Sequence, residues 1–285
     1  MSPQRRSTLR AWWLGQQLKE LREANGLTVR DAGAYLQRSS GTISRFESAD
    51  YPIRRGDVLA LLDLYGVSDE PRRRNLIRLG EEVWQKGWWD GYADAVDQRF
   101  IDYPWLESRA TKLRAYETML VTGLLQTRDY AQVLIEDTNG ATAGSDQIAQ
   151  WVNFRMERQQ VLDQEEPLQV ELVLDESVLR RVIGEPDTMR AQLTHLVESA
   201  RRPNIEIRVL PLRPHHKAGL EGSFKLFTMP EPYPEVGYVD TPAGAVYVET
   251  PDTDRFATMY DRLWDITLEA DESAELISAA AEELQ

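Results

Sequence analysis

Two adjacent carboxylates follow a predicted strand, where they could do acid–base chemistry. Asp175 and Glu176 come directly after the alternating segment Leu168–Leu174, and paired carboxylates can act as general acid and base. A structural role explains them more simply. Arg180 lies four residues beyond Glu176, and acidic residues stabilise the N-termini of helices. We therefore expect a salt-bridged helix start at this point and no enzyme activity.

Metal and cofactor chemistry lack a suitable set of side chains. His215 and His216 are adjacent, and adjacent histidines rarely bind the same ion. His195 is distant from both in sequence, and the chain has no cysteine. Gly219 and Gly222 indicate a flexible loop before a strand and do not form a phosphate-binding motif. The sequence predicts no metal site and no cofactor.

The most polar cluster of the body is the helical segment Arg155–Gln159, which reads Arg-Met-Glu-Arg-Gln. A buried arginine–glutamate network that braces the fold is the favoured interpretation. An anion site formed by its arginines is the alternative.

The body that holds these residues alternates between strand and helix patterns. The order of strand Leu168–Leu174, helix Pro186–Arg201 and strand Ile205–Leu210 predicts a right-handed crossover between parallel strands. Further strands are expected at Ser223–Met229, Val236–Val239 and Ala245–Glu249, and helices at Thr127–Asp137, Asp146–Leu162, Asp254–Leu268 and Glu272–Leu284. The body is therefore predicted to be mixed α/β around one sheet.

An aromatic-rich connector is predicted ahead of the body. Its aromatic residues are Trp84, Trp88, Trp89, Tyr92, Tyr103 and Trp105. They could form a stacking platform for single-stranded nucleic acid or a ligand cage, but the local charge is not basic, with Asp90 and Glu107 among the nearby acids. Packing between domains or subunits is therefore favoured.

The N-terminal part of the chain has the pattern of short helices around one core. The segment Leu14–Asn25 has leucines at helical spacing, and Thr28–Leu36 opens with a capping box. Ser39 can cap a third helix, Ser40–Glu47, and a fourth is expected at Arg55–Tyr65. Helices this short share a core only if they cross steeply.

Charge is distributed unevenly between these parts. Residues 1–80 carry 14 Lys and Arg and 9 Asp and Glu, a net charge of +5, whereas the other 205 residues have a net charge of −19. This asymmetry is expected when only the N-terminal part touches phosphates. Charge alone leaves open that both parts are ordinary solvated surfaces.

Targeting signals are not evident. No apolar run approaches the roughly 18 residues that span a bilayer, and Ala11–Leu14 is too short for a signal peptide. The lack of cysteine fits a reducing compartment. We expect a cytoplasmic protein with no membrane partner.

The segment Leu27–Leu36 followed by Ser39–Glu47 resembles the repressor-type helix-turn-helix family, often called the Xre or Cro/C1 type. The ending Thr42–Glu47, Thr-Ile-Ser-Arg-Phe-Glu, is the most specific element. Two departures stand out, because the turn lacks the glycine often found there and Gly41 replaces a larger side chain in the recognition helix. Glycine weakens a helix by up to about 1 kcal/mol.

The resemblance implies that the helix from Ser40 enters the major groove of double-stranded DNA. Arg45 is the strongest candidate, able to pair two donors with a guanine or a phosphate. The predicted DNA-binding residues are Ser40, Thr42, Ser44, Arg45, Arg30 and Arg38, the last two as phosphate contacts. The alternatives are solvated or capping hydroxyls, and an ion pair between Arg45 and an acid such as Glu47.

Four stretches of the body resemble an actinobacterial domain of unknown function that is fused behind this kind of helix-turn-helix in many regulators. They are Gly123–Ala131, Arg155–Gln159, Asp175–Arg180 and Pro203–Pro211. The resemblance implies an antitoxin-like or developmental regulator of an actinomycete, often encoded beside a short protein.

Together these observations predict an α+β protein. A helix-turn-helix bundle (residues 1–80) precedes the connector (81–110) and a larger mixed α/β domain (111–285). We expect a homodimeric transcriptional regulator that binds specific DNA sequences and whose C-terminal domain senses a ligand or a small partner protein. The alternative is an antitoxin-like interaction protein that sequesters a short partner protein encoded nearby.

Overall fold

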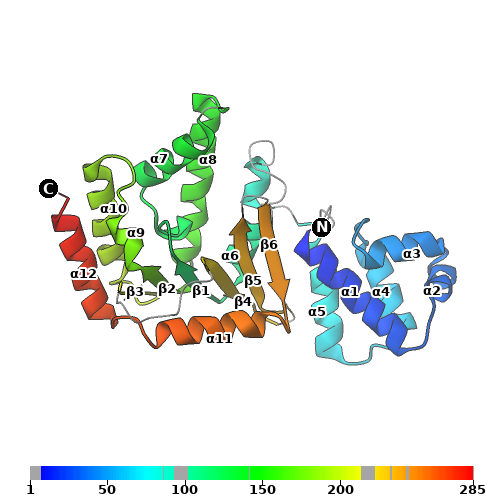
Figure 1. The fold of residues 1–285 in the computed structure, drawn as a ribbon. Coiled ribbons are helices and arrows are strands. Elements are labelled where there is room, and N and C mark those ends of the chain that lie inside the picture. Colours follow the sequence, from blue (N-terminus) through cyan, green and yellow to red (C-terminus); the bar gives the residue numbers. More distant parts are fainter. Residues whose placement is uncertain are drawn as a thin grey trace. The chain divides into compact units, whose positions relative to one another are not determined.

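The computed structural model describes residues 8–85, 87–92, 102–140, 142–212, 222–231, 233–241 and 244–284. The chain forms two compact units (Figure 1). The first unit comprises Met1–Asp90 with Glu231–Tyr233, and the second unit comprises Gly91–Pro230 with Pro234–Gln285. The predicted α+β class is confirmed, since the first unit is helical and the second holds a mixed sheet.

The first unit is a bundle of short helices, as predicted. They are α1 (Leu9–Ala24), α2 (Val29–Leu36), α3 (Ser40–Glu47), α4 (Arg55–Leu64) and α5 (Glu70–Glu82), followed by the 3-10 helix η1 (Trp88–Tyr92). The predicted capping box is present, because the Thr28 side chain accepts from the Asp31 amide and the Asp31 carboxylate accepts from the Thr28 amide. Ser39 caps α3 by accepting from the Thr42 amide at 3.1 Å.

Apolar residues of α1, α3 and α4 meet in the core of the first unit. Leu14, Leu18, Ile43, Val58 and Leu62 are all fully buried. The close crossing of α1 over the end of α3 requires a glycine in α1. A Cβ on Gly15 would lie 2.7 Å from the Phe46 carbonyl oxygen and 2.6 Å from that of Glu47. The end of α3 is therefore held tightly against α1.

The second unit is built on a sheet with the strand order β3-β2-β1-β4-β5-β6. The strands are β1 (Lys112–Glu117), β2 (Gln169–Asp175), β3 (Ile205–Leu210), β4 (Phe224–Thr228), β5 (Val236–Thr241) and β6 (Gly244–Glu249). β1, β2 and β3 are parallel, which confirms the predicted parallel pairing across the crossover, and β4, β5 and β6 are antiparallel. The sheet thus changes from parallel to antiparallel between β1 and β4.

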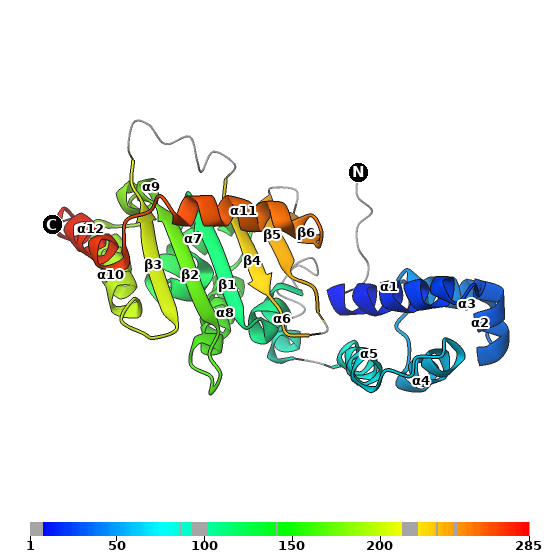
Figure 2. The same cartoon turned by 90° about the horizontal axis from the view of Figure 1, so that it is seen from below.

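Helices cover both faces of this sheet. They are α6 (Asp102–Arg109), α7 (Arg128–Asn139), α8 (Ser145–Arg158), α9 (Glu176–Arg180), α10 (Pro186–Ser199), α11 (Thr253–Trp264) and α12 (Ala270–Glu282), with the 3-10 helices η3 (Gly123–Leu125) and η4 (Gln159–Leu162). Figure 2 shows α11 crossing one face of the sheet, with α7 and α8 on the other face. Tyr260 and Leu263 of α11 pack on Tyr116, Phe224 and Leu226 of the sheet.

Several elements differ from the expectations or were not foreseen. The helix expected over Asp146–Leu162 ends at Arg158 and continues as η4. The central strand β1 and the helix α6 had no prediction, and α6 buries Tyr103 and Trp105 of the aromatic-rich connector within the second unit. The division into a helix-turn-helix bundle (1–80), a connector (81–110) and a larger domain (111–285) stays a prediction. In the part of the chain that the structure describes, no helix is long and apolar enough to cross a membrane.

Candidate DNA-binding surface and cavity

Helix α3 has a buried face and a polar face. Ile43 and Phe46 are 0% and 4% exposed and point into the core, whereas Ser40, Ser44 and Arg45 are exposed. The spacing that buries the two apolar side chains turns the other positions outward. The structure therefore presents the predicted hydroxyl and guanidinium donors on the outside of one short helix.

Arg45 is not held by a carboxylate of its own helix. Its Nε lies 3.4 Å from the Gly41 carbonyl oxygen, four residues back. Glu47 instead accepts from Arg22 of α1, at 2.6 Å to Nε and 2.9 Å to Nη2, and both side chains are 8% exposed. This hydrogen bond to Glu47 raises the pKa of Arg22. The Arg45–Glu47 ion pair weighed from the sequence is therefore not formed.

The hydroxyls of α3 have different surroundings. The Thr42 hydroxyl lies 2.9 Å from the Ser39 hydroxyl, so Thr42 takes part in capping the helix. Ser40 and Ser44 are exposed. The capping alternative thus accounts for Thr42 better than for the two serines.

Arg30 and Arg38 lie outside α3 but in the same unit. Arg30 is exposed on α2, and Arg38 lies in the turn before α3. Arg38 Nη2 is 3.3 Å from the Asp57 carboxylate, with 47% of the arginine side chain exposed. An exposed pair of this kind contributes at most about 1 kcal/mol. Arg38 can therefore exchange Asp57 for a phosphate at little cost.

Two exposed tyrosines were missed by sequence reasoning. Tyr35 of α2 and Tyr51, after α3, are each 53% exposed, and the Tyr51 ring packs 6.1 Å from that of Phe46. Each has a hydroxyl able to donate to a phosphate oxygen. Their outward direction follows from the packing of the helices, and no local sequence signal reveals it.

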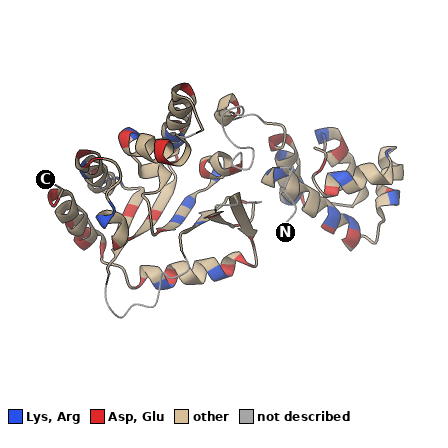
Figure 3. Cartoon of the chain, turned by 45° about the horizontal axis from the view of Figure 1, so that its top comes forward, with Lys and Arg blue, Asp and Glu red and all other residues tan. Residues whose placement is uncertain are grey.

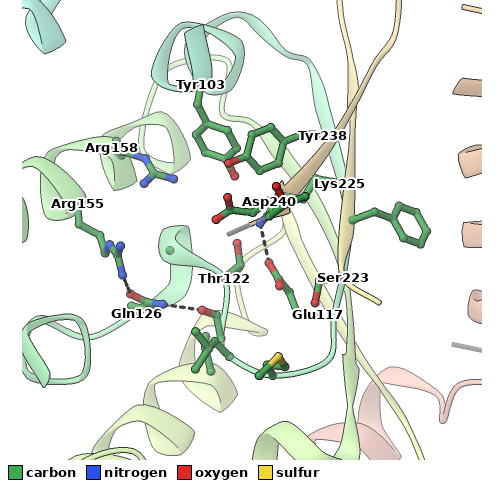
Figure 4. A pocket seen from close by; sticks show the side chains of 16 residues that line it. Tyr103, Glu117, Thr122, Gln126, Arg155, Arg158, Ser223, Lys225, Tyr238 and Asp240 are labelled. Carbon is green, nitrogen blue, oxygen red and sulfur yellow. Dashed lines mark hydrogen bonds and ion pairs between the residues drawn. The ribbon is translucent and has the colours of Figure 1, made fainter. Parts of the chain in front are cut away.

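The second unit contains a cavity of about 470 Å³ at the carboxyl end of β1 (Figure 4). Its lining residues are Tyr103, Glu117, Met119, Leu120, Val121, Thr122, Gly123, Gln126, Arg155, Arg158, Ser223, Phe224, Lys225, Tyr238, Asp240 and Thr241. They come from α6, α8, η3 and the ends of β1, β4 and β5, where the sheet changes from parallel to antiparallel. In open sheets, ligands bind outside the carboxyl ends of parallel strands at such a change of direction.

Two of the three basic side chains in the cavity wall are paired with glutamates. Arg158 donates to both oxygens of Glu107, at 2.7 and 2.8 Å, with the side chains 6% and 1% exposed. Lys225 Nζ lies 2.8 Å from Glu117. Burial disfavours the charged lysine, but Glu117 outweighs it and the pKa of Lys225 is raised. The Arg158–Glu107 pair is the buried arginine–glutamate brace favoured from the sequence, although its glutamate comes from α6.

Arg155, the third basic side chain, is held differently. Its Nη1 donates to Gln126 Oε1 at 2.8 Å, and Gln126 Nε2 donates to the Val121 carbonyl at 2.6 Å. Gln159 Nε2 fixes the same loop by donating to the carbonyls of Gly123 and Gln126. Burial, followed by the nearby Arg158, lowers the pKa of Arg155 to about 10. Among the described residues no carboxylate pairs with Arg155.

The residues considered for catalysis have structural roles. Asp175 caps α9 by accepting from the Ser177 amide at 2.9 Å, and Glu176 pairs with Arg180 at 3.2 Å. These two contacts form the salt-bridged helix start that the sequence predicts. His195 is half-buried in α10, and burial lowers its pKa.

The adjacent pair His215 and His216, with Gly219, lies outside the described residues. Among the residues that are described, no cluster of histidine and acidic side chains could hold a metal ion.

The acidic excess of the chain lies on the second unit. Its helix α12 carries the acids Asp271, Glu272, Glu275 and Glu282 and no basic residue (Figure 3). The outer face of α3, by contrast, carries Arg45 and no exposed acid. The surface suited to phosphates is therefore on the first unit.

Comparison with protein families identifies both parts of the chain. Residues 13–75 match a helix-turn-helix domain, so the first unit belongs to a class of domain that binds DNA. Residues 100–279 match the family described as a domain of unknown function (DUF5753), and the chain belongs to this family. Neither the curated proteins nor the solved structures gave a match.

Proposed function

We propose that this protein is a transcriptional regulator of the Xre type, which reads a specific DNA sequence with α3 and receives a signal through its second unit. The observation that supports it best is the arrangement of α3. Ile43 and Phe46 anchor the helix in the core, and the hydroxyls and Arg45 face outward. A helix held in this way can enter the major groove with its side chains at the base edges.

The individual contacts follow from the exposure of each donor. Arg45, whose Nε lies 3.4 Å from the Gly41 carbonyl oxygen, pairs with a guanine or a phosphate. Ser40 and Ser44 contact base edges or phosphates near the start of the helix. Arg30 and Arg38 contact phosphates, which position the unit without reading sequence.

The regulator acts as a dimer in this proposal. Two copies of α3 would then read half-sites about one helical turn apart. The second unit receives either a ligand or a short partner protein, and it is not an enzyme. The capping role of Asp175 and the ion pair of Glu176 support a structural use of its best-placed acids.

Gel-shift titration on DNA from upstream of the protein's own gene tests the proposal. Arg45→Ala should weaken binding by about 1–3 kcal/mol, roughly 5-fold to 150-fold. Arg74→Ala is the matched control, because Arg74 is 68% exposed on α5 and should change affinity little. Equal affinities for the two variants, or an affinity that does not fall with salt, would show that α3 does not read this DNA.

Co-purification separates the sequestering alternative from regulation by α3. A stable complex with a short neighbouring protein, together with DNA affinity that Arg45→Ala leaves unchanged, would favour an antitoxin-like interaction protein. The same complex with an Arg45-dependent DNA affinity would make the short protein the signal of the regulator.

A further inference from the structure

Among the described residues, Arg155 is the cation of the cavity wall with which no carboxylate pairs. Arg158 is neutralised by Glu107 and Lys225 by Glu117. Arg155 donates only to the neutral amide of Gln126 within the described part of the chain. A partly buried cation without a counterion is costly. An anion entering the cavity would lower that cost.

The geometry of Arg155 suits a carboxylate. Gln126 occupies Nη1 and is itself fixed by its bond to the Val121 carbonyl. The Nε and Nη2 donors remain for a ligand, and a planar guanidinium edge matches the two oxygens of a carboxylate. Because the loop and α8 already hold this arrangement, the side chains would lose little conformational entropy when a ligand binds.

The charges of the cavity favour a monoanion over a phosphate dianion. Glu117 and Asp240 also line the cavity, and Asp240 is exposed and pairs with no cation among the described residues. Both carboxylates repel added negative charge. A ligand with one negative charge therefore fits better than one with two.

The opposite wall is aromatic. The rings of Tyr103 and Tyr238 lie 4.5 Å apart in an edge arrangement, and both residues are 3% exposed. Figure 4 shows these rings on one side, with Arg155 and Gln126 on another. A cavity of about 470 Å³ that combines these rings with charged and amide side chains has the size of a small-molecule site.

We propose that this cavity binds a small organic acid, with its carboxylate on Arg155 and its apolar part against Tyr103 and Tyr238. The ligand is the signal that the second unit receives. This regulatory consequence rests on the proposed function, whereas the binding itself does not.

Calorimetric titration of the full-length protein tests the binding. The probes are benzoate, 4-hydroxyphenylacetate and octanoate, each beside its neutral amide, with inorganic phosphate as a dianion control. At least one carboxylate should bind, and phosphate should not compete with it. The corresponding amide should bind at least about ten-fold more weakly, because it cannot form the charge-assisted bonds to Arg155. Failure of all three carboxylates to bind would overturn the proposal.

Matched variants locate the site. Arg155→Gln should weaken the carboxylate about ten-fold or more and leave the amide unchanged, and Arg155→Lys, which keeps the charge but loses the planar edge, should fall between. Arg128→Gln is the control, because Arg128 is exposed on α7 and donates to Asn153 outside the cavity. Equal loss in both glutamine variants, or unchanged binding in both Arg155 variants, would place the ligand elsewhere. Unchanged amide binding also shows that the variant is folded.

A gel shift with the binding carboxylate present separates the two proposals. Carboxylate binding that leaves DNA affinity unchanged would overturn the regulatory role and leave the site. DNA binding independent of Arg45, with carboxylate binding intact, would overturn the proposed function and leave the site.

Discussion

The two units share an arrangement but use it differently. Each has a buried arginine–glutamate pair, one member of which lies on the same helix as the arginine to which we assign binding. In the first unit Glu47, the last residue of α3, pairs with Arg22, and Arg45 lies two residues earlier. In the second unit Arg158 pairs with Glu107, and Arg155 lies three residues earlier on α8.

The surroundings of the two binding arginines differ. Arg45 is exposed to solvent, whereas Arg155 is enclosed and fixed by Gln126. An exposed, adaptable cation suits a large polyanion, where affinity comes from many salt-dependent contacts. An enclosed, positioned cation suits a small ligand that must be held by few contacts. A buried ion pair can therefore position either kind of site, and exposure decides which.

The largest expected effect comes from breaking the pair in the second unit. Glu107→Ala leaves Arg158 buried without its counterion and should lower the free energy of unfolding by about 3–5 kcal/mol. Urea unfolding measures the loss, and hydrogen exchange should place it in α6 and α8. Glu283→Ala is the control, because Glu283 is 64% exposed in its pair with Arg180 and should cost less than about 1 kcal/mol. Similar losses in both variants would mean that burial of the pair is not what stabilises this unit.

The corresponding change in the first unit should be nearly as large and should also affect DNA binding. Glu47→Ala leaves Arg22 unpaired at the crossing of α1 and α3, at a cost of about 3–5 kcal/mol. Glu23→Ala removes the other carboxylate near the same arginine, at 3.3 Å but 55% exposed, and should cost less than about 1 kcal/mol. Hydrogen exchange in α1 and α3 measures the difference in stability. The DNA affinity measured by gel shift should fall for Glu47→Ala and not for Glu23→Ala. DNA binding that survives loss of protection in α3 would contradict the role of this helix.

Local signals explain what the sequence could predict. The capping residues Thr28 and Ser39 each accept from an amide three residues away, so the starts of α2 and α3 could be predicted from the local sequence. The strand Ile205–Leu210 has the predicted bounds, and its burial alternates from Ile205 to Val209. The outward face of α3 follows from its apolar spacing in the same way.

Contacts between distant segments could not be predicted. Arg158 meets Glu107, 51 residues earlier, and not the nearby Glu157, whose carboxylate accepts from Tyr92. The cavity joins six elements, so no local pattern marks its residues. The sequence also could not show how the turn after α2 forms without a glycine. Gln37 takes the left-handed conformation at the end of α2, with φ of 53°.

A smaller effect should distinguish phosphate contacts from base contacts within the first unit. Arg30→Ala removes an exposed cation of α2 and should weaken binding to all DNA sequences alike, reducing the salt slope by about 1. Arg45→Ala should instead weaken the specific site most and relax the preference for it. Titrations against specific and unrelated DNA at several salt concentrations measure both. A sequence-dependent loss for Arg30→Ala would assign that arginine to a base contact.

The smallest effect concerns Gly41 of the recognition helix. A Cβ at this position would meet only the Ser39 hydroxyl at 3.8 Å, so Gly41→Ala should stabilise the first unit by up to about 1 kcal/mol. Gly33→Ala is the contrasting variant, since its Cβ would lie 2.8 Å from the Arg38 carbonyl oxygen and should destabilise the turn. Thermal unfolding should show opposite shifts for the two variants. Because the Gly41 position is exposed, we expect the DNA affinity of Gly41→Ala to change little. A large loss of affinity together with a gain in stability would instead show that the glycine allows a base or phosphate to approach the backbone.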